Sequence, residues 1–521
     1  MATPSEKLGD ALEALHELQT SGSVAIRSAD LSRTHRERLV QNGFLEEVIK
    51  GWYVPARPDE TRGESTAWYA SFWQFCAAYL NHLKGDDWCL SPEQSIALHT
   101  ENMTVPKQLL ARATKARNNV TELPHGTSLL DIRAALPEPA QVTTKNGLRI
   151  YSLPAALIAC SKQSFTQNPI DMRAALSMVS DASEVLEQLL EGGHSSIAGR
   201  LAGAFRNIGR AQIADDIMGT MRAAGYDLRE TDPFEQQSSL SFSRREQSPY
   251  VNRIRLMWQD MRETVIAHFP ASPSQTVDKT AYMQHVEDVY VTDAYHSLSI
   301  EGYRVTPELI NRVRTGDWNP EQNADDKERQ NALAARGYWQ AYQAVRKSIE
   351  QILDGHNSGE VVDNDHRVWY REMFAPGVTA GIHKPADLAG YRNAPVFIRR
   401  SMHTPPSREA VRDAMPAFFE LLQAEENAAV RVVLGHFIFV YIHPYMDGNG
   451  RTGRFLMNAM LASGGYPWTI VPLEKRNEYM AALEEASTNQ NIEPFTKFLG
   501  SLVQGALEGK PEPLIPNGRA I

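Results

Sequence analysis

The sequence is poor in cysteine and lacks the patterns that cysteines form in disulfide frameworks or zinc sites. Only Cys76, Cys89 and Cys160 occur among 521 residues, and no two of them are close in the chain. An odd number of isolated cysteines is typical of reduced core thiols in a cytoplasmic protein. We therefore expect neither a disulfide-stapled secreted fold nor a structural zinc site.

Long apolar runs are also missing. No uninterrupted run approaches the roughly 18 residues of a membrane-spanning helix, and residues 1–14 are charged, without the apolar core of a secretory signal. We expect a cytoplasmic protein with no membrane contact. The net charge is −10, from 53 basic and 63 acidic residues. That balance argues against wholesale binding to nucleic acid but leaves a local basic patch open.

The first 60 residues predict a small domain of their own. Residues 5–19 have helical spacing, residues 27–40 predict a short helix, a turn and a second helix, and residues 44–54 predict a two-stranded hairpin. This order is that of a winged helix, and it resembles the N-terminal domain of AbiEi-type antitoxins. DNA binding would use Arg33, Arg36 and Arg38. The alternative is a winged helix used only for packing or protein contacts, since residues 27–50 carry a net charge of only +1.

Residues 61–245 predict a mixed α+β middle domain with no recognisable site chemistry. Its first helix, residues 68–83, is rich in aromatic residues, a pattern more typical of a core than of a cofactor site. The polar stretch 238–249 predicts a linker with a boundary near residue 245.

From residue 246 to 510 the pattern is dominantly helical, so the fold class is mainly α, preceded by the α+β region. Residues 282–300 predict one helix, which ends at Gly302. Residues 388–400 predict a short β-hairpin. Residues 429–442 are apolar nearly all round, which is typical of a buried helix, and Pro444 breaks that helix.

The loop after this buried helix carries residue types that phosphate chemistry needs. His443 suits a general base, because a neutral imidazole accepts a hydroxyl proton near pH 7. Asp447 suits Mg²⁺, or alternatively caps the next helix. Gly448, Asn449 and Gly450 let backbone N–H groups approach a phosphate at a helix N-terminus.

Two arginines follow the glycines at a spacing of three. Arg451 and Arg454 can therefore lie side by side on the first helical turn and contact two phosphates. The alternative is a solvated helix face.

The segment His443-Pro444-Tyr445-x-Asp447-Gly448-Asn449-Gly450-Arg451-x-x-Arg454 resembles the signature of the Fic family, enzymes that transfer AMP from ATP to protein hydroxyls. The likeness covers about residues 250–505. The resemblance implies that Arg451 contacts the β-phosphate and Arg454 the γ-phosphate. It also implies ATP and Mg²⁺ as cofactors, and a target hydroxyl of Ser, Thr or Tyr, on another protein or on the chain itself.

The resemblance extends to the predicted hairpin, Val396, Phe397, Ile398 and Arg399, which would be the family's flap and hold a target segment near the loop. The family commonly has glycine where Arg399 stands, so target choice can differ here. Tyr479 and Ser487, with Arg476 before them, align with a segment that lines the nucleotide base in relatives. Asn is common at the position of Ser487.

Ser297, Glu301 and Gly302 resemble the family's inhibitory helix. A carboxylate at residue 301 can pair with Arg454 and so remove the contact that holds the γ-phosphate. The alternative is an ordinary helix end with an incidental glutamate. The sequence therefore predicts an autoinhibited adenylyltransferase.

Three other activities stay open. Fic relatives that transfer phosphate tend to have lysine where Gly450 stands, which favours AMP transfer here, and some relatives with the inhibitory glutamate also remove AMP. The third is a DNA-binding regulator or antitoxin-like protein with a Fic sensor domain. A homodimer is a further expectation.

Overall fold

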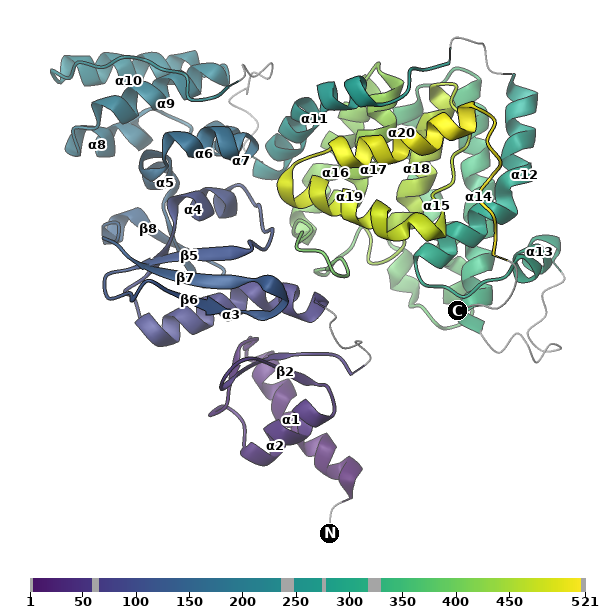
Figure 1. The fold of residues 1–521 in the computed structure, drawn as a ribbon, viewed down its shortest axis with the longest axis horizontal. Helices are drawn as coiled ribbons and strands as arrows, with labels where there is room; N and C mark the ends of the chain where they lie inside the picture. The colour runs from purple at the N-terminus through teal and green to yellow at the C-terminus, as the bar shows by residue number, and fades with distance from the viewer. Residues whose placement is uncertain (1–2, 59–64, 236–247, 274–277, 317–328, 517–521) are drawn as a thin grey trace. The chain divides into compact units, whose positions relative to one another are not determined.

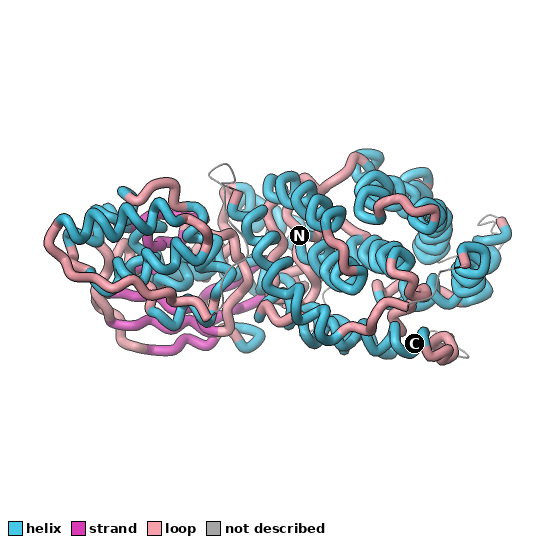
Figure 2. The backbone as a smooth tube through the Cα atoms, turned by 90° about the horizontal axis from the view of Figure 1, so that it is seen from above, coloured by secondary structure: helices cyan, strands magenta, loops and turns pink. Residues whose placement is uncertain are grey.

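A computed structural model describes residues 3–58, 65–235, 248–273, 278–316 and 329–516. The chain forms two compact units, Met1–Arg253 with Phe397–Thr404, and Ile254–Val396 with Pro405–Ile521. All strands of the described residues lie in the first unit, and helices dominate the second (Figure 2). The predicted fold class, mainly α with an α+β N-terminal region, is confirmed. The predicted domain borders near residues 60 and 245 lie outside the described residues, so the three-domain division stays a prediction.

The N-terminal elements form a small three-stranded sheet with two helices. They are α1 (Pro4–Thr20), β1 (Ile26–Arg27), α2 (Arg33–Gln41), β2 (Leu45–Ile49) and β3 (Trp52–Pro55), and the antiparallel strand order is β1-β3-β2. Leu15 of α1, Leu39 of α2 and Leu45 of β2 share one core. The predicted hairpin over residues 44–54 therefore forms, with one additional strand beside it.

The short helix predicted at the start of residues 27–40 is absent. The carboxylate of Asp30 accepts the backbone N–H of Arg27 at 2.8 Å and pairs with its guanidinium, which fixes a turn there. Ser32 then begins α2, because its hydroxyl accepts the N–H of His35. Only one helix follows the turn, and the winged-helix interpretation stays a prediction.

A second, mixed sheet follows. Its elements are α3 (Thr66–Lys84), β4 (Cys89–Leu90), α4 (Pro92–His99), β5 (Gln108–Ala113), β6 (Asn119–Glu122) and β7 (Ser128–Arg133), with strand order β4-β5-β7-β6 and a parallel β5–β7 pair. Strands β8 (Val142–Lys145) and β9 (Leu148–Tyr151) form a hairpin. Trp68, Phe72 and Phe75 of α3 are fully buried, so the aromatic stripe is core, as its pattern predicts.

Six helices follow β9 in the described residues up to 235. They are α5 (Leu153–Ala159), α6 (Lys162–Gln167), α7 (Pro169–Met178), α8 (Ser183–Glu191), α9 (Ser195–Asn207) and α10 (Ala211–Ala223). Gly199 and Gly203 of α9 pack so closely against the backbone at Arg229 and Thr231 that a Cβ at either position would collide with it. Small residues therefore let this segment lie directly on the helix.

The second unit is a helical assembly around a buried central helix (Figure 1). Its helices are α11 (Pro249–His268, whose first turn belongs to the first unit), α12 (Lys279–Ile300), α13 (Pro307–Thr315), α14 (Arg329–Leu353), α15 (Ser358–Thr379), α16 (Arg408–Ala424), α17 (Ala428–Ile442), α18 (Asn449–Ser463), α19 (Arg476–Asn489) and α20 (Glu493–Leu507). Helix α17 is buried along nearly its whole length, as its apolar sequence predicts. Among the described residues, no helix is both long and apolar enough to cross a bilayer.

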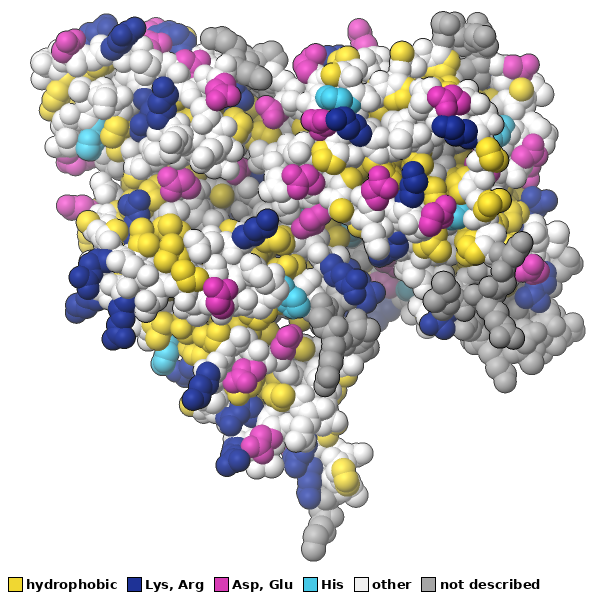
Figure 3. Space-filling model, in the orientation of Figure 1, with side chains coloured by type: hydrophobic (Ala, Val, Ile, Leu, Met, Phe, Trp, Pro, Cys, Tyr) yellow, Lys and Arg dark blue, Asp and Glu magenta, His cyan; other side chains and the backbone are white. Residues whose placement is uncertain are grey.

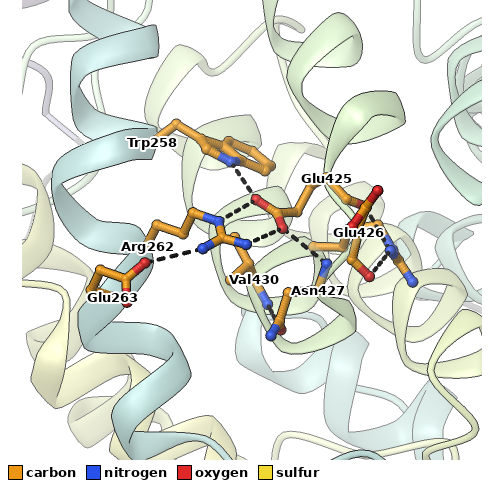
Figure 4. A network of polar contacts seen from close by, with 8 residues as sticks. Trp258, Arg262, Glu263, Glu425, Glu426, Asn427 and Val430 are labelled. Atoms are coloured by element: carbon orange, nitrogen blue, oxygen red, sulfur yellow. Dashed lines mark hydrogen bonds and ion pairs between the residues drawn. The ribbon is translucent and has the colours of Figure 1, made fainter. Parts of the chain in front are cut away.

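A polar network ties α11 to the start of α17 (Figure 4). Arg262 donates from Nε and Nη2 to the two carboxylate oxygens of Glu425, at 2.9 and 3.0 Å, and Trp258 donates to the same carboxylate at 3.2 Å. Glu425 also accepts the backbone N–H of Asn427, whose side chain caps α17 by accepting the N–H of Val430. The helix that leads into the loop is therefore fixed at its first turn.

The β-hairpin predicted over residues 388–400 does not form. A short 3₁₀ helix, Pro385–Leu388, is followed by an irregular segment up to α16. Its backbone groups bond outside the segment instead of across it, since the N–H of Arg392 donates to the carbonyl of Pro444 and that of Arg400 donates to the hydroxyl of Thr66. Pro395 offers no N–H for a ladder.

Candidate active site

The loop between α17 and α18 has two residues in the left-handed backbone region. His443 ends α17 with φ 53° and ψ 61°, and Gly448 precedes α18 with φ 78°. The side chain of Asn449 closes the loop, because its amide accepts the N–H of Tyr445 and donates to the carbonyl of the same residue, both at 2.9 Å. A left-handed non-glycine residue costs about 1–3 kcal/mol and persists only where its surroundings hold it.

The imidazole of His443 is kept neutral. Burial lowers its pKa to about 4, and the nearby Arg392 acts in the same direction. Its Nδ1 lies 3.2 Å from the carbonyl oxygen of Val440. Because a carbonyl only accepts, Nδ1 carries the hydrogen and Nε2 keeps a free electron pair. That is the state a general base requires.

Asp447 lies exposed in the loop. One of its oxygens accepts the N–H of Gly448, and the same oxygen is 3.3 Å from a guanidinium nitrogen of Arg451. No cluster of three or more potential metal ligands occurs in the described part of the chain. A single exposed carboxylate fits Mg²⁺, which usually takes only one or two carboxylates when phosphate oxygens and water supply its other ligands.

The first turn of α18 is the candidate anion-binding surface. The first N–H groups of a helix have no partner within the helix, and Gly448, as N-cap, offers no side chain to satisfy them. A Cβ at residue 450 would lie 2.4 Å from Oε1 of Glu301, so glycine there leaves room for that carboxylate beside α18. Both predicted loop glycines therefore have a structural reason.

The guanidinium of Arg451 is buried between two aromatic rings that the sequence did not suggest. The ring centroids of Tyr303 and Phe374 lie 5.2 and 5.1 Å from it. Two of its nitrogens, Nε and Nη2, make no hydrogen bond to the described residues, although Nη2 faces Asp447. Tyr303 directly follows Gly302, so its position next to the predicted inhibitory helix could have suggested that it lies near the arginines. Phe374 comes from the distant α15 and gives no such signal.

Arg454 is held by the last turn of α12. Its Nη2 donates to Glu301 Oε1 at 2.7 Å and to the carbonyl of Ser297 at 3.0 Å, and its Nε donates to the hydroxyl of Ser297 at 2.9 Å. Burial works against the charge on Arg454, but Glu301 raises its pKa. Gly302 follows with φ 90° and ends the helix. The structure thus brings together the three residues that the sequence placed in an inhibitory helix and the arginine they would hold.

The three residues expected around the nucleotide base, Arg476, Tyr479 and Ser487, differ from one another in burial and in hydrogen-bond partners. Tyr479 is buried and bonds through its hydroxyl to Nε2 of His436, at 2.7 Å. Arg476 donates to the carbonyl of Ile300, at the end of α12. Ser487 is half-buried further along α19.

The predicted flap is divided between the two units. Val396 belongs to the unit that carries the loop, whereas Phe397, Ile398 and Arg399 fold with the first unit. None of the four is in a strand. Their role beside a target segment therefore stays a prediction.

These contacts together make up the candidate site. A neutral histidine lies on the loop between two core helices, and the glycine-bearing first turn of α18 follows with two buried arginines. Residues 366–461 match the Fic/DOC family. The matched stretch includes the loop between α17 and α18 and the first turns of α18.

The relatives that match over a longer stretch are named "Protein adenylyltransferase Fic". The one from Nematostella vectensis is 27% identical over 240 residues, 45% of this chain and 50% of that protein. The one from Drosophila virilis is 28% identical over 245 residues, 46% of this chain and 45% of that protein. The chain thus spans about half the length of these curated relatives.

Two solved structures are similar at a lower level. Fic-1 from C. elegans is 18% identical with a TM-score of 0.37, covering 62% of this chain and 91% of that one. A Fic-domain signalling protein from Bacteroides thetaiotaomicron is 16% identical with a TM-score of 0.34, covering 50% of this chain and 95% of that one.

Proposed function

We propose that this protein transfers AMP from ATP to a hydroxyl group of a target protein, or of itself, and that Glu301 restrains the transfer. The observation that carries the proposal is the pairing of Arg454 with Ser297 and Glu301 beside a neutral His443. The Fic match and the adenylyltransferase names of the relatives support the same activity.

The proposed reaction is a displacement at the α-phosphorus of ATP. Nε2 of His443 accepts the proton of the target hydroxyl, whose oxygen then bonds to the α-phosphorus. The bond from that phosphorus to the bridging oxygen breaks, and pyrophosphate leaves with the negative charge. Arg451 and Arg454 would stabilise that charge on the β- and γ-phosphates.

Asp447 would hold Mg²⁺, which supplies charge neutralisation on the phosphates when it is bound. The exposed carboxylate beside the anion-binding turn of α18 supports this assignment.

The proposed restraint follows from competition for one cation. Arg454 is 4% exposed, and Ser297 and Glu301 occupy three of its hydrogen bonds. A γ-phosphate that needs the same guanidinium must displace the carboxylate or bind without this contact. ATP bound without it would not present its α-phosphorus correctly for attack.

Labelled ATP separates AMP transfer from its alternatives. We expect Glu301→Gly protein to attach the α-phosphate label of ATP to protein and to attach no γ-phosphate label. Protein-bound γ label would replace the proposal with phosphate transfer. Release of AMP from already modified protein would add AMP removal to the activity.

A His443→Ala change in the same background tests the base. We expect transfer to be lost while ATP binding, measured by calorimetry, changes by no more than about twofold, because the imidazole acts on the target hydroxyl and not on the phosphates. Undiminished transfer in this variant would remove His443 from that role.

DNA binding is the second candidate function, and the α2 geometry gives it limited support. Arg33 pairs with Glu37, Arg36 donates to the carbonyl of Ser28, and Arg38 donates to that of Lys7. The face in Figure 3 carries basic and acidic side chains interspersed. DNA binding that weakens with salt and is lost on Arg36→Glu would favour a regulator. Absence of binding would exclude DNA as a partner, and binding that Arg36→Glu leaves unchanged would exclude the α2 interface.

The three free cysteines are all buried, which fits the expected cytoplasmic location. Homodimer formation stays a prediction, and sedimentation of the full chain tests it.

A further inference from the structure

Arg392 lies in the irregular segment before α16 and is almost completely buried, with 2% of its surface exposed. The sequence placed it in the predicted hairpin and gave it no role. In the structure its side chain points into the junction where α17 gives way to the loop. It therefore lies at the backbone of His443 without belonging to the loop.

The side chain and backbone of Arg392 together hold three successive carbonyl oxygens. Nε donates to the carbonyl of His443 at 2.8 Å, Nη2 reaches that of Ile442 at 3.5 Å, and the backbone N–H donates to that of Pro444 at 2.8 Å. The guanidinium also donates to the carbonyls of Ala394 and Pro406. These last two contacts fix the guanidinium itself.

The carbonyls of Ile442 and His443 are acceptors that an ending helix leaves unpaired. They also carry the negative end of the α17 dipole, where a cation is favourable. Arg392 therefore acts on α17 as a cationic C-cap supplied from another part of the chain. It holds the carbonyls on both sides of a residue whose left-handed conformation needs external support.

Burying the charged guanidinium of Arg392 costs free energy. Burial lowers the pKa of Arg392 to about 10, and its hydrogen-bond partners in the described part of the chain are carbonyl oxygens. An apolar side chain would avoid that cost. The planar fork of arginine can bond several oxygens in one fixed arrangement, which lysine cannot reproduce. Such geometry suits a residue that sets a position.

We propose that Arg392 is the positioning residue for His443: it fixes the backbone of residues 442–444 so that the imidazole faces the target hydroxyl. It touches neither ATP nor the target. The proposal rests on the AMP transfer proposed above, because that activity is what gives the position of His443 a consequence.

The kinetic test compares Arg392→Met and Arg392→Lys with Arg431→Met in Glu301→Gly protein. Arg431 is a matched control, because it also donates to backbone carbonyls, those of Glu425 and Glu426 at the opposite end of α17. We expect Arg392→Met to lower kcat by about a hundredfold, the scale of a 1 Å misplacement. The KM for ATP and its Kd should change less than about twofold, since the phosphate contacts of α18 are untouched.

Partial recovery of kcat in Arg392→Lys, with Arg431→Met close to the parent, would support the proposal. Unchanged kcat in Arg392→Met, or an equal loss in Arg431→Met, would overturn it. So would a fall in kcat matched by an equal rise in the Kd for ATP.

A second readout does not depend on catalysis. In protein labelled with ¹³C at histidine Cε1, the signal that disappears in His443→Ala identifies this imidazole. We expect Arg392→Met and Arg392→Lys to move or broaden that signal, and Arg431→Met to leave it in place. An unmoved signal in both Arg392 variants would overturn the proposal, even if Glu301→Gly protein transferred no AMP and the proposed function itself failed.

Discussion

Three histidines of the second unit are kept neutral by burial, and they do different work. Burial lowers the pKa of His366, His436 and His443 to about 4. His366 and His436 bond to the hydroxyls of Tyr391 and Tyr479 inside the core. His443 alone among the three lies on the loop before the first turn of α18. Neutrality is therefore shared by these three histidines, and what distinguishes the proposed base is its position.

The same three histidines predict that acid destabilises the protein. The unfolded chain binds these protons below pH 6.5, whereas the folded protein does not until about pH 4. As pH falls from 6.5 to 5, each histidine should lower the free energy of unfolding by about 1.5 kcal/mol. Asp293 offsets part of this, because burial raises its pKa to about 6 and the folded state gains its proton first.

Urea unfolding of the full chain at pH 7 and pH 5 measures this effect. His436→Gln should reduce the pH dependence, and the same change at the exposed His268 should not. Equal stability at both pH values would contradict the expected histidine effect.

At the scale of elements, hydrogen bonds hold helix α12 at Asp293, one turn before the residues that contact Arg454. The carboxylate of Asp293 accepts hydrogen bonds from Tyr338 of α14 at 2.5 Å and from Trp468 at 3.1 Å. All of these groups are buried. The contact with Arg454 is thus made by the end of a helix whose middle is fixed.

The Ser297 hydroxyl should contribute measurably to the restraint. A hydrogen bond to a charged group is worth about 1.5–3 kcal/mol, and part of the hold remains through the carbonyl of Ser297 and through Glu301. We therefore expect Ser297→Ala to raise AMP transfer about three- to tenfold, less than Glu301→Gly. Ser299→Ala, two residues further along α12, is the control. If both serine variants match the wild-type rate, the hydroxyl plays no part.

The anchor of α11 should matter for stability. Glu425 is nearly buried and holds Arg262 and Trp258, whereas Glu420 pairs with Arg255 at the surface. Removing a buried partner costs about 2–4 kcal/mol, and a surface partner under about 1 kcal/mol. Glu425→Ala should therefore lower the free energy of unfolding far more than Glu420→Ala. Similar losses in the two variants would argue against the anchor.

The elements that the sequence predicts well are those with a local cause. The apolar run before His443, the glycine at residue 448 and the end of α12 at Gly302 each follow from neighbouring residues. The expected hairpin over residues 388–400 is wrong because its hydrogen bonds go to Pro444 and Thr66, which are distant in sequence. The contact of the Phe374 ring with Arg451 and the capping of α17 by Arg392 also join residues that are distant in sequence, so neighbouring residues do not predict them.

At the scale of the whole molecule, one segment of the C-terminal half folds with the N-terminal unit. Residues 397–404 belong to the first unit, where Met402 packs on the aromatic core and its carbonyl accepts the N–H of Val105. Composition and hydrophobic periodicity describe each stretch of sequence by itself. They therefore do not predict that residues 397–404 fold with the first unit. The candidate site residues of the loop could be predicted because they are contiguous in sequence.

The most direct measurement of the central claim is transfer of α-labelled AMP by full-length wild-type protein, Glu301→Gly protein and the Glu301→Gly, His443→Ala double variant. Freeing Arg454 should raise incorporation at least about tenfold, equivalent to about 1.4 kcal/mol of recovered transition-state stabilisation. The double variant should incorporate no label. Equal incorporation by wild-type and Glu301→Gly protein, or label retained in the double variant, would contradict the account.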